Sequence, residues 1–108
     1  MESQEVVDAL VALGQLNRLA VFRLIVEHGS VGIRPLEISE ALDIPSATLS
    51  FHLKELFQAG LVSVDREGRH LTYRPRPETV ESLMEFLLKN CCGGRDCRPK
   101  PVKKRTCR

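Results

Sequence analysis

The segment from Pro35 to Gly60 constrains the fold of this chain more than any other feature. Pro35 stands in the first turn of a short predicted helix, which ends at the sequence DIP of residues 43–45. A second helix is predicted to open at Ser46 and to run to Gly60. A short helix, a tight turn and an amphipathic second helix form the helix-turn-helix arrangement.

The two faces of this second helix differ in chemistry. At about 100° per residue, Leu49, Leu53 and Leu56 fall on one side and form a hydrophobic face. The opposite side carries short or polar residues together with a fully outward aromatic ring: Ala47, Ser50, Phe51, Lys54 and Gln58. Because a helix that faces only water does not need an outward phenylalanine, we expect this side to contact a partner molecule.

Helices are also predicted before this unit. Ser3 can cap a first helix that ends near Gly14, and Asn17 can cap a second helix that ends at Gly29. Apolar residues recur at helical spacing in the first three helices: Val6, Val7, Leu10 and Leu13; Leu19, Phe22, Ile25 and Val26; and Ile38, Ala41 and Leu42. Four helices are therefore expected up to Gly60.

Two alternating runs follow, LVSVD and HLTYR, and the polar turn REGR with Gly68 joins them. Because a two-stranded hairpin is not stable alone, we expect it to pack on the helices. A last helix is predicted to start at Pro77, with an apolar seam that continues to a cysteine: Val80, Met84, Leu87 and Cys91. The predicted fold is mainly α with a two-stranded β-hairpin wing, a winged helix-turn-helix in the order ααααββα.

Charge is divided unevenly along the chain. Residues 1–94 hold 9 Lys or Arg against 13 Asp or Glu, whereas residues 95–108 hold 7 against 1. A basic, proline-containing tail has little to bury. We therefore predict one winged-helix domain over residues 1–90, followed over residues 91–108 by a cysteine-containing segment and a basic mobile tail. A solubilising role for this tail is as consistent with its composition as a phosphate-binding one.

Several function classes are disfavoured by composition and motifs. The chain has 108 residues, of which 43% are hydrophobic and 28% charged, and it has neither an apolar run near membrane-spanning length nor a signal sequence. A cytoplasmic protein without a membrane segment is expected. The motifs GxSxG and HExxH and a glycine-rich phosphate loop are absent, so we expect no enzyme and no bound cofactor.

Double-stranded DNA is the partner that the outer face of the fourth helix favours. Hydroxyl groups and a flexible cation reach base edges and phosphates from a helix in the major groove, and an aromatic ring can rest on a thymine methyl. Cations at the tip of the wing suit the DNA backbone or the minor groove. The expected contacts are Ser46, Thr48, Ser50, Phe51 and Lys54 on the helix and Arg66, Arg69 and His70 on the wing. His52, at the edge of the apolar face, is expected to pack inside the protein.

Three cysteines gather after the last helix, in the sequence NCCGGRDC. A disulfide between Cys91 and Cys92 would be strained, because adjacent Cα atoms lie about 3.8 Å apart, closer than a disulfide usually spans. Gly93 and Gly94 allow the chain to turn back and bring Cys97 against the other two thiols. Three thiolates suit a trivalent arsenic or antimony centre, whereas zinc prefers four ligands and would need Cys107 or a histidine.

The run ALDIPSATLSFHLKELFQAGLV, followed by VDREGRHLTYR, resembles the ArsR/SmtB family of winged-helix metalloregulators, with LSFHLKEL and EGRHLTY as its most specific pieces. The resemblance covers about residues 6–90. It implies a homodimer assembled from the first and last helices, which occupies operator DNA until As(III) or Sb(III) binds. It also implies that Ser46 to Gln58 form the recognition helix and Arg66 to His70 the wing tip.

One departure from the family pattern concerns the metal site. Some arsenic-sensing members carry the motif CVC at the start of the third helix, where this chain has Arg34 and Leu36. Other members place thiols after the last helix, a variant that Cys91, Cys92 and Cys97 fit. Alternatives that stay open are a sensor of Zn, Cd or Pb, a thiol redox sensor, and a metal carrier, although a carrier needs neither the polar helix face nor the wing.

Overall fold

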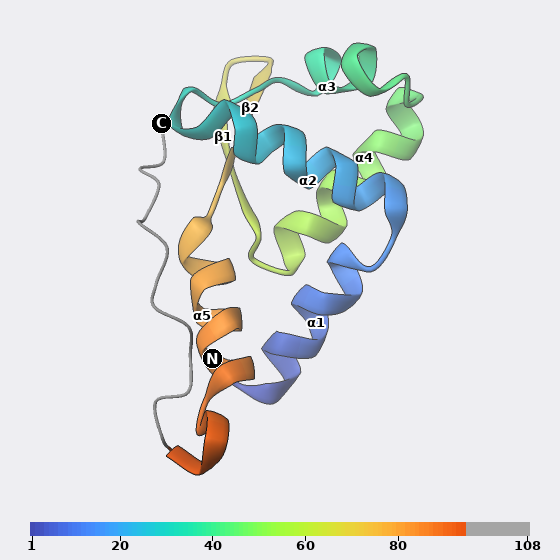
Figure 1. Ribbon diagram of the computed structural model, residues 1–108. Helices are drawn as coiled ribbons and strands as arrows, with labels where there is room; N and C mark the ends of the chain where they lie inside the picture. Colours follow the sequence, from blue (N-terminus) through green and yellow to red (C-terminus); the bar gives the residue numbers. More distant parts are fainter. Residues whose placement is uncertain (95–108) are drawn as a thin grey trace.

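The computed structural model describes residues 1–94, and its elements follow the predicted order of four helices, a hairpin and a fifth helix (Figure 1). The first three helices are α1 (Ser3–Leu13), α2 (Leu16–His28) and α3 (Pro35–Leu42), with a short 3-10 turn, η1 (Gly29–Val31), between the last two. The rest are α4 (Ser46–Gln58), β1 (Val62–Glu67), β2 (His70–Pro75), α5 (Pro77–Leu88) and a second 3-10 turn, η2 (Cys91–Gly94). The winged helix-turn-helix prediction is confirmed.

The starts of α1 and α2 differ slightly from the predicted ones. Glu2, rather than Ser3, is the N-cap of α1, and its side chain and that of Glu5 bond reciprocally to the backbone. Gln15, rather than Asn17, caps α2, because its side-chain oxygen accepts the backbone N–H of Arg18 at 2.7 Å. Glu2 and Gln15 therefore cap α1 and α2 in place of the predicted Ser3 and Asn17.

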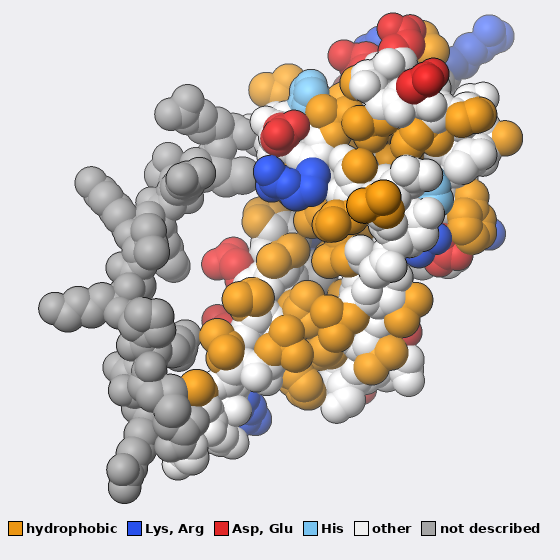
Figure 2. Space-filling model, turned by 45° about the vertical axis from the view of Figure 1, so that its right-hand side comes forward, with side chains coloured by type: hydrophobic (Ala, Val, Ile, Leu, Met, Phe, Trp, Pro, Cys, Tyr) orange, Lys and Arg blue, Asp and Glu red, His pale blue; other side chains and the backbone are white. Residues whose placement is uncertain are grey.

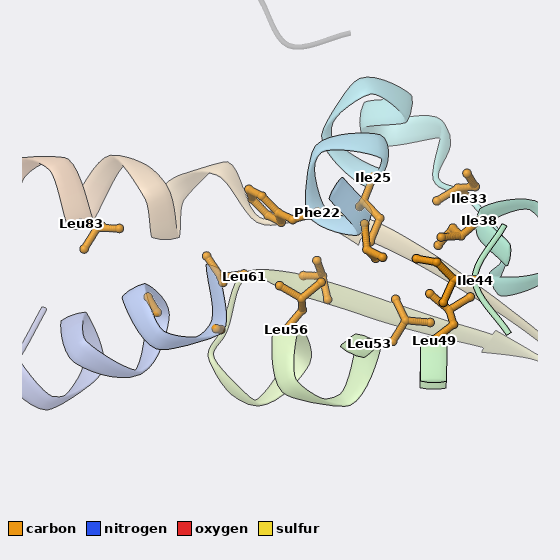
Figure 3. Close-up of a cluster of buried hydrophobic side chains, with 14 of the residues drawn as sticks. Phe22, Ile25, Ile33, Ile38, Ile44, Leu49, Leu53, Leu56, Leu61 and Leu83 are labelled. Carbon is orange, nitrogen blue, oxygen red and sulfur yellow. The ribbon is translucent and has the colours of Figure 1, made fainter. Parts of the chain in front are cut away.

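The main hydrophobic core lies between α2, α3, α4 and the base of the hairpin (Figure 3). Ile25 of α2, Ile38 of α3 and Leu56 of α4 are completely buried. In Figure 3, Leu49, Leu53 and Leu56 point from α4 into the same space as Ile25 and Ile33. The predicted inner face of α4 is confirmed, and burial of these side chains fixes which face of α4 remains outside.

Helices α1 and α5 pack on each other beside this core. Leu83 of α5 points toward α1 (Figure 3) and belongs to the same cluster of buried side chains. On α1 the buried residues are Val6, Ala9 and Ala12, whereas Val7 and Leu10 are exposed. The predicted single apolar face of α1 was therefore wrong in part: small alanines allow close packing inside, and larger aliphatic residues form a second face outside. The predicted inner faces of α2 and α3 were also wrong in part. In α2, Val21 is buried and Leu19 is exposed, and in α3, Ala41 is exposed.

The hairpin is anchored to the helices at its base. Its register pairs Val62 with Pro75 and Glu67 with His70, so the turn is only Gly68 and Arg69, shorter than the predicted REGR. Ile33 and Tyr73 exchange two backbone hydrogen bonds, of 2.9 and 3.0 Å, which add a short bridge from the α2–α3 connection to β2. The hairpin therefore packs on the helices, as expected for an element that is unstable alone.

A glycine is required where this connection meets β2. Gly32 has φ of 82°, and a Cβ atom built there would lie 2.5 Å from the Thr72 methyl carbon. Arg74 of β2 adds a hydrogen bond from its Nε to the carbonyl oxygen of Ser30, at 2.9 Å, and an ion pair with Asp65 of β1. These contacts set the direction in which the wing projects.

The chain leaves its helical path directly after α5. Lys89 is extended, Asn90 has φ of 59°, and Cys91 begins the separate turn η2. The predicted continuation of the α5 seam to Cys91 is therefore wrong, because the left-handed Asn90 ends the helical periodicity. Gly93 has φ of 69°, and the predicted approach of Cys97 to the other two thiols lies outside the described residues. Within residues 1–94, no single helix is long and apolar enough to span a membrane. Helix α1 and the segment 16–31 meet the length and hydropathy requirement only as a pair, and the chain bends by 98° between them.

Candidate nucleic-acid interface

Helix α4 presents a polar outer face on a well-supported scaffold. Its buried side holds Leu49, Leu53 and Leu56. The side chains that the sequence predicted as DNA contacts are all exposed: Ser46, Thr48, Ser50, Phe51 and Lys54. Phe57, which was not predicted, is exposed as well. Ala47 and Gln58 are exposed beside them. The face therefore offers hydroxyl donors and a single cation along consecutive turns, the groups that hydrogen-bond to base edges and phosphates.

The turn between α3 and α4 fixes the direction in which α4 starts. Asp43 adopts the left-handed conformation, with φ of 53° and ψ of 48°. The Ser39 hydroxyl donates to the carbonyl oxygen of Ile44 at 2.6 Å, and the Ile44 N–H donates to the carbonyl oxygen of Ser39 at 3.2 Å. Because Ile44 is also buried in the core, the start of α4 has little freedom to move relative to α3.

Phe51 is less outward than the sequence predicted. It is 53% exposed, and the guanidinium carbon of Arg18 lies 5.6 Å from the centre of its ring. The next residue, His52, is only 5% exposed, which confirms that it packs inside the protein. Arg18 reaches this residue as well, because its Nε donates to His52 Nδ1 at 3.4 Å. Burial, and secondly the positive charge of Arg18, lower the pKa of His52.

Sequence reasoning missed Arg18 as part of this interface. It lies 34 positions before His52, on a helix that is not part of the helix-turn-helix unit. In the sequence it is one polar residue in the apolar run of α2, and its partners become visible only when α2 crosses α4. The spacing rules that identified the α4 residues hold within one helix and therefore contain no signal for it.

The tip of the wing carries the three predicted residues in exposed positions. Arg66 lies on β1 opposite Leu71, Arg69 lies in the two-residue turn, and His70 opens β2. Gly68 has φ of 59°, which the tight turn requires. Two cations therefore project from the end of a hairpin that is anchored at its base, a suitable arrangement for phosphate contact.

The predicted thiol site is only partly within the described residues. Cys91 is partly buried at the start of η2, and Cys92 follows it in the same turn. Cys97 and Cys107 lie outside the described residues. Within residues 1–94 no group of three His, Cys, Asp or Glu side chains is placed to hold a metal ion. At the start of α3, where this chain lacks the CVC motif, Leu36 is 69% exposed.

Comparison with known proteins identifies the family. A helix-turn-helix domain model matches residues 13–65. The HTH-type transcriptional regulator MJ1325 of Methanocaldococcus jannaschii is 30% identical over 76 residues, which are 70% of this chain and 83% of that protein. The chain belongs to the helix-turn-helix transcriptional regulators. The regulator YdfF of Bacillus subtilis is 38% identical over 52 residues, 48% of this chain but only 23% of YdfF, so the chain spans about a quarter of that relative.

Solved structures similar to this regulator share its winged-helix fold. An ArsR-like regulator from Rhodococcus has a TM-score of 0.69 at 20% identity, covering 78% of this chain and 76% of its own. A homodimeric winged-helix domain from Mycobacterium bovis has a TM-score of 0.65 at 22% identity, covering 89% of both chains. A protein described as a possible transcriptional regulator for arsenical resistance has a TM-score of 0.64 at 24% identity, covering 74% and 80%. The fold is that of ArsR-type DNA-binding regulators, and the related proteins are regulators rather than enzymes.

Proposed function

We propose that this regulator is a cytoplasmic repressor that binds operator DNA as a homodimer and leaves it when As(III) or Sb(III) binds. The observation that carries DNA binding is the exposed side of α4, which presents hydroxyl groups, a lysine and two aromatic rings along the helix while the inner side is buried. Each subunit would place α4 in a major groove and the tip of its wing on the adjacent backbone.

An exposed apolar surface supports a homodimer. Val7, Leu10 and Val11 project from α1, and Met84, Leu87 and Leu88 project from α5. Hydrophobic side chains gather over these two helices in Figure 2. Contiguous apolar surface of this kind is rare on a monomer and typical of a subunit interface. The homodimeric neighbour from Mycobacterium bovis adds to this support.

Three thiols are the proposed receptor for the metalloid: Cys91, Cys92 and Cys97. A trivalent arsenic or antimony centre takes three soft sulfur ligands, and Cys91 and Cys92 occupy consecutive positions in one turn. A set of three ligands needs more than the groups within residues 1–94, so Cys97 belongs to the proposal. The similar fold of the protein described as a possible regulator for arsenical resistance is a further support.

The location of η2 explains how the ion would act on DNA binding. This turn follows α5 after only Lys89 and Asn90, and α5 carries half of the proposed dimer surface. Metalloid binding would shift α5 and, through the dimer, the distance between the two α4 helices. They must lie about 34 Å apart to enter successive major grooves. A 100-fold loss of affinity needs a coupling of about 2.7 kcal/mol, within the usual range for allostery.

Single Cys→Ser variants test this function by release from operator DNA as arsenite is added. Cys91→Ser, Cys92→Ser and Cys97→Ser should each bind DNA normally and fail to release it, because a hydroxyl group does not replace a thiolate. The matched control is Cys107→Ser, which should release normally, because a trivalent centre is satisfied by the other three sulfur ligands.

Normal release by all three variants would show that these thiols are not the receptor. Release by a mild thiol oxidant in place of arsenite would instead identify a redox sensor, and release by Zn, Cd or Pb alone would identify another thiophilic metal as the inducer.

A further inference from the structure

Arg18 joins three helices through one guanidinium group. Its NH1 atom donates to the carbonyl oxygen of Ala12, in the last turn of α1, at 3.4 Å. Its Nε donates to His52 Nδ1 at 3.4 Å, and its guanidinium carbon lies 5.6 Å from the centre of the Phe51 ring. The group therefore connects the end of α1, the start of α2 and the middle of α4.

The place of Arg18 on its own helix is electrostatically unfavourable. It lies in the first turn of α2, where the helix macrodipole disfavours a cation, and no acidic residue lies in that turn. Its backbone is held there by the Gln15 cap. The contacts across the helices, rather than helix stability, are therefore what this position provides.

Two adjacent contacts on α4 fix the rotation of this helix. Phe51 and His52 are about 100° apart around the helix axis, so one group that touches both opposes rotation in either direction. A side chain about 6 Å from the axis moves about 1 Å for each 10° of rotation. Ser50 and Lys54 would move by this amount relative to base edges, a shift that breaks a hydrogen bond while leaving loose phosphate contacts intact.

We propose that Arg18 is a positioning residue for specific DNA binding, which fixes the rotation of α4 against the α1–α2 corner and holds the Phe51 ring. This inference rests on the proposed function only in that α4 reads DNA. The planar fork of arginine is essential to it. Lysine keeps the charge, but its three donors radiate from one nitrogen, so it cannot reach Ala12 and His52 from separate nitrogens while a planar group lies beside the Phe51 ring.

The test compares Arg18→Lys with the matched control Arg23→Lys, an exposed arginine on the same helix. The probes are a duplex that the wild-type protein selects from random-sequence DNA and an unrelated duplex, and thermal melting checks the fold. We expect Arg18→Lys to bind the selected duplex about tenfold more weakly, the value of one hydrogen bond and one cation–π contact, with the unrelated duplex bound as before. Arg23→Lys should match the wild type with both probes.

A double-variant cycle provides the second measurement. If Arg18 acts through the ring and the rotation of α4, Arg18→Lys and Phe51→Leu together should weaken selected-duplex binding no more than the stronger single change. Effects that multiply would contradict the inference. Three further results would contradict it. Arg18→Lys could bind the selected duplex like the wild type, or lose affinity equally for both duplexes, which indicates a phosphate contact. It could also lose the fold, which indicates a purely structural residue.

The Ser50→Ala, Lys54→Ala variant distinguishes a failure of the proposed function from a failure of the proposed role of Arg18. If Ser50→Ala with Lys54→Ala still binds the selected duplex normally, α4 does not read DNA and the proposed function is wrong. If that variant loses binding while Arg18→Lys does not, only the role of Arg18 is removed.

Discussion

Helix α4 and the α1–α5 pair bury one face each, but they differ in what they leave outside. On α4, the leucines are buried, and the exposed side consists of Ser, Thr, Ala, Lys and Gln with two aromatic rings, Phe51 beside Arg18 and Phe57. On α1 and α5, aliphatic side chains are exposed as well as buried. Val7 is 49% exposed and Met84 is 51% exposed, although Val6 and Leu83 beside them are buried.

This difference indicates two kinds of partner. A polar face is stable in water, so a partner can bind it and leave, as operator DNA must. An exposed aliphatic face is stabilised by about 25 cal/mol for each Å² that a partner covers, which favours a lasting contact. In the proposed function, α4 and the wing would form the reversible surface for DNA, and α1 and α5 the lasting surface between subunits.

A charge placed on the apolar surface of α1 and α5 should have the largest effect, because it opposes the proposed contact between subunits. Val7→Glu or Leu87→Glu should weaken the dimer about 1,000-fold, because a symmetric interface loses each contact twice and must also bury the carboxylate. Sedimentation at several concentrations measures this. Val31→Glu is the matched control, since Val31 is exposed on η1 and should leave the dimer intact. Dimers that persist in Val7→Glu and Leu87→Glu would place the interface elsewhere.

Removing polar groups from α4 should have the next largest effect. Ser50→Ala together with Lys54→Ala is expected to weaken selected-duplex binding about 100-fold, because two contacts are lost in each half-site and the net value of a hydrogen bond is about 0.7 kcal/mol at this scale. Dimerisation and arsenite binding should be unchanged. Lys89→Ala, which removes an exposed lysine at the end of α5, controls for charge and should bind DNA normally. Normal affinity in the double variant would contradict the assignment of α4.

The smallest expected effect concerns the wing. Arg66→Ala with Arg69→Ala should weaken binding to selected and unrelated duplexes alike, by about tenfold, and flatten the dependence of affinity on salt, because contacts to phosphate release counterions. Affinity measured over a range of salt concentrations decides this. A loss confined to the selected duplex would mean that the wing reads bases.

Much of the α4 surface could be predicted because it depends on one helix alone. The positions of Leu49, Leu53 and Leu56 determine the inner face, and the outer residues follow from helical geometry. The order of elements was predictable for a similar reason, since Pro35, Gly60 and Gly68 mark boundaries locally. The face of α1 was not predictable in the same way, because Val6 and Val7 are equally hydrophobic and only the neighbouring helices decide which of them is buried.

The sequence by itself determined the helix-turn-helix, the hairpin and the set of side chains that α4 offers to a partner, because each depends on spacing within a short segment. Only the tertiary structure decided that Arg18 lies against Phe51 and His52, that α1 keeps a second apolar face outside, and that Asn90 takes Cys91 off the path of α5. The first two depend on how helices far apart in sequence cross, and the third on a backbone angle that the apolar periodicity of α5 does not contain. Local patterns specify which groups a helix presents, whereas packing between helices decides what those groups touch.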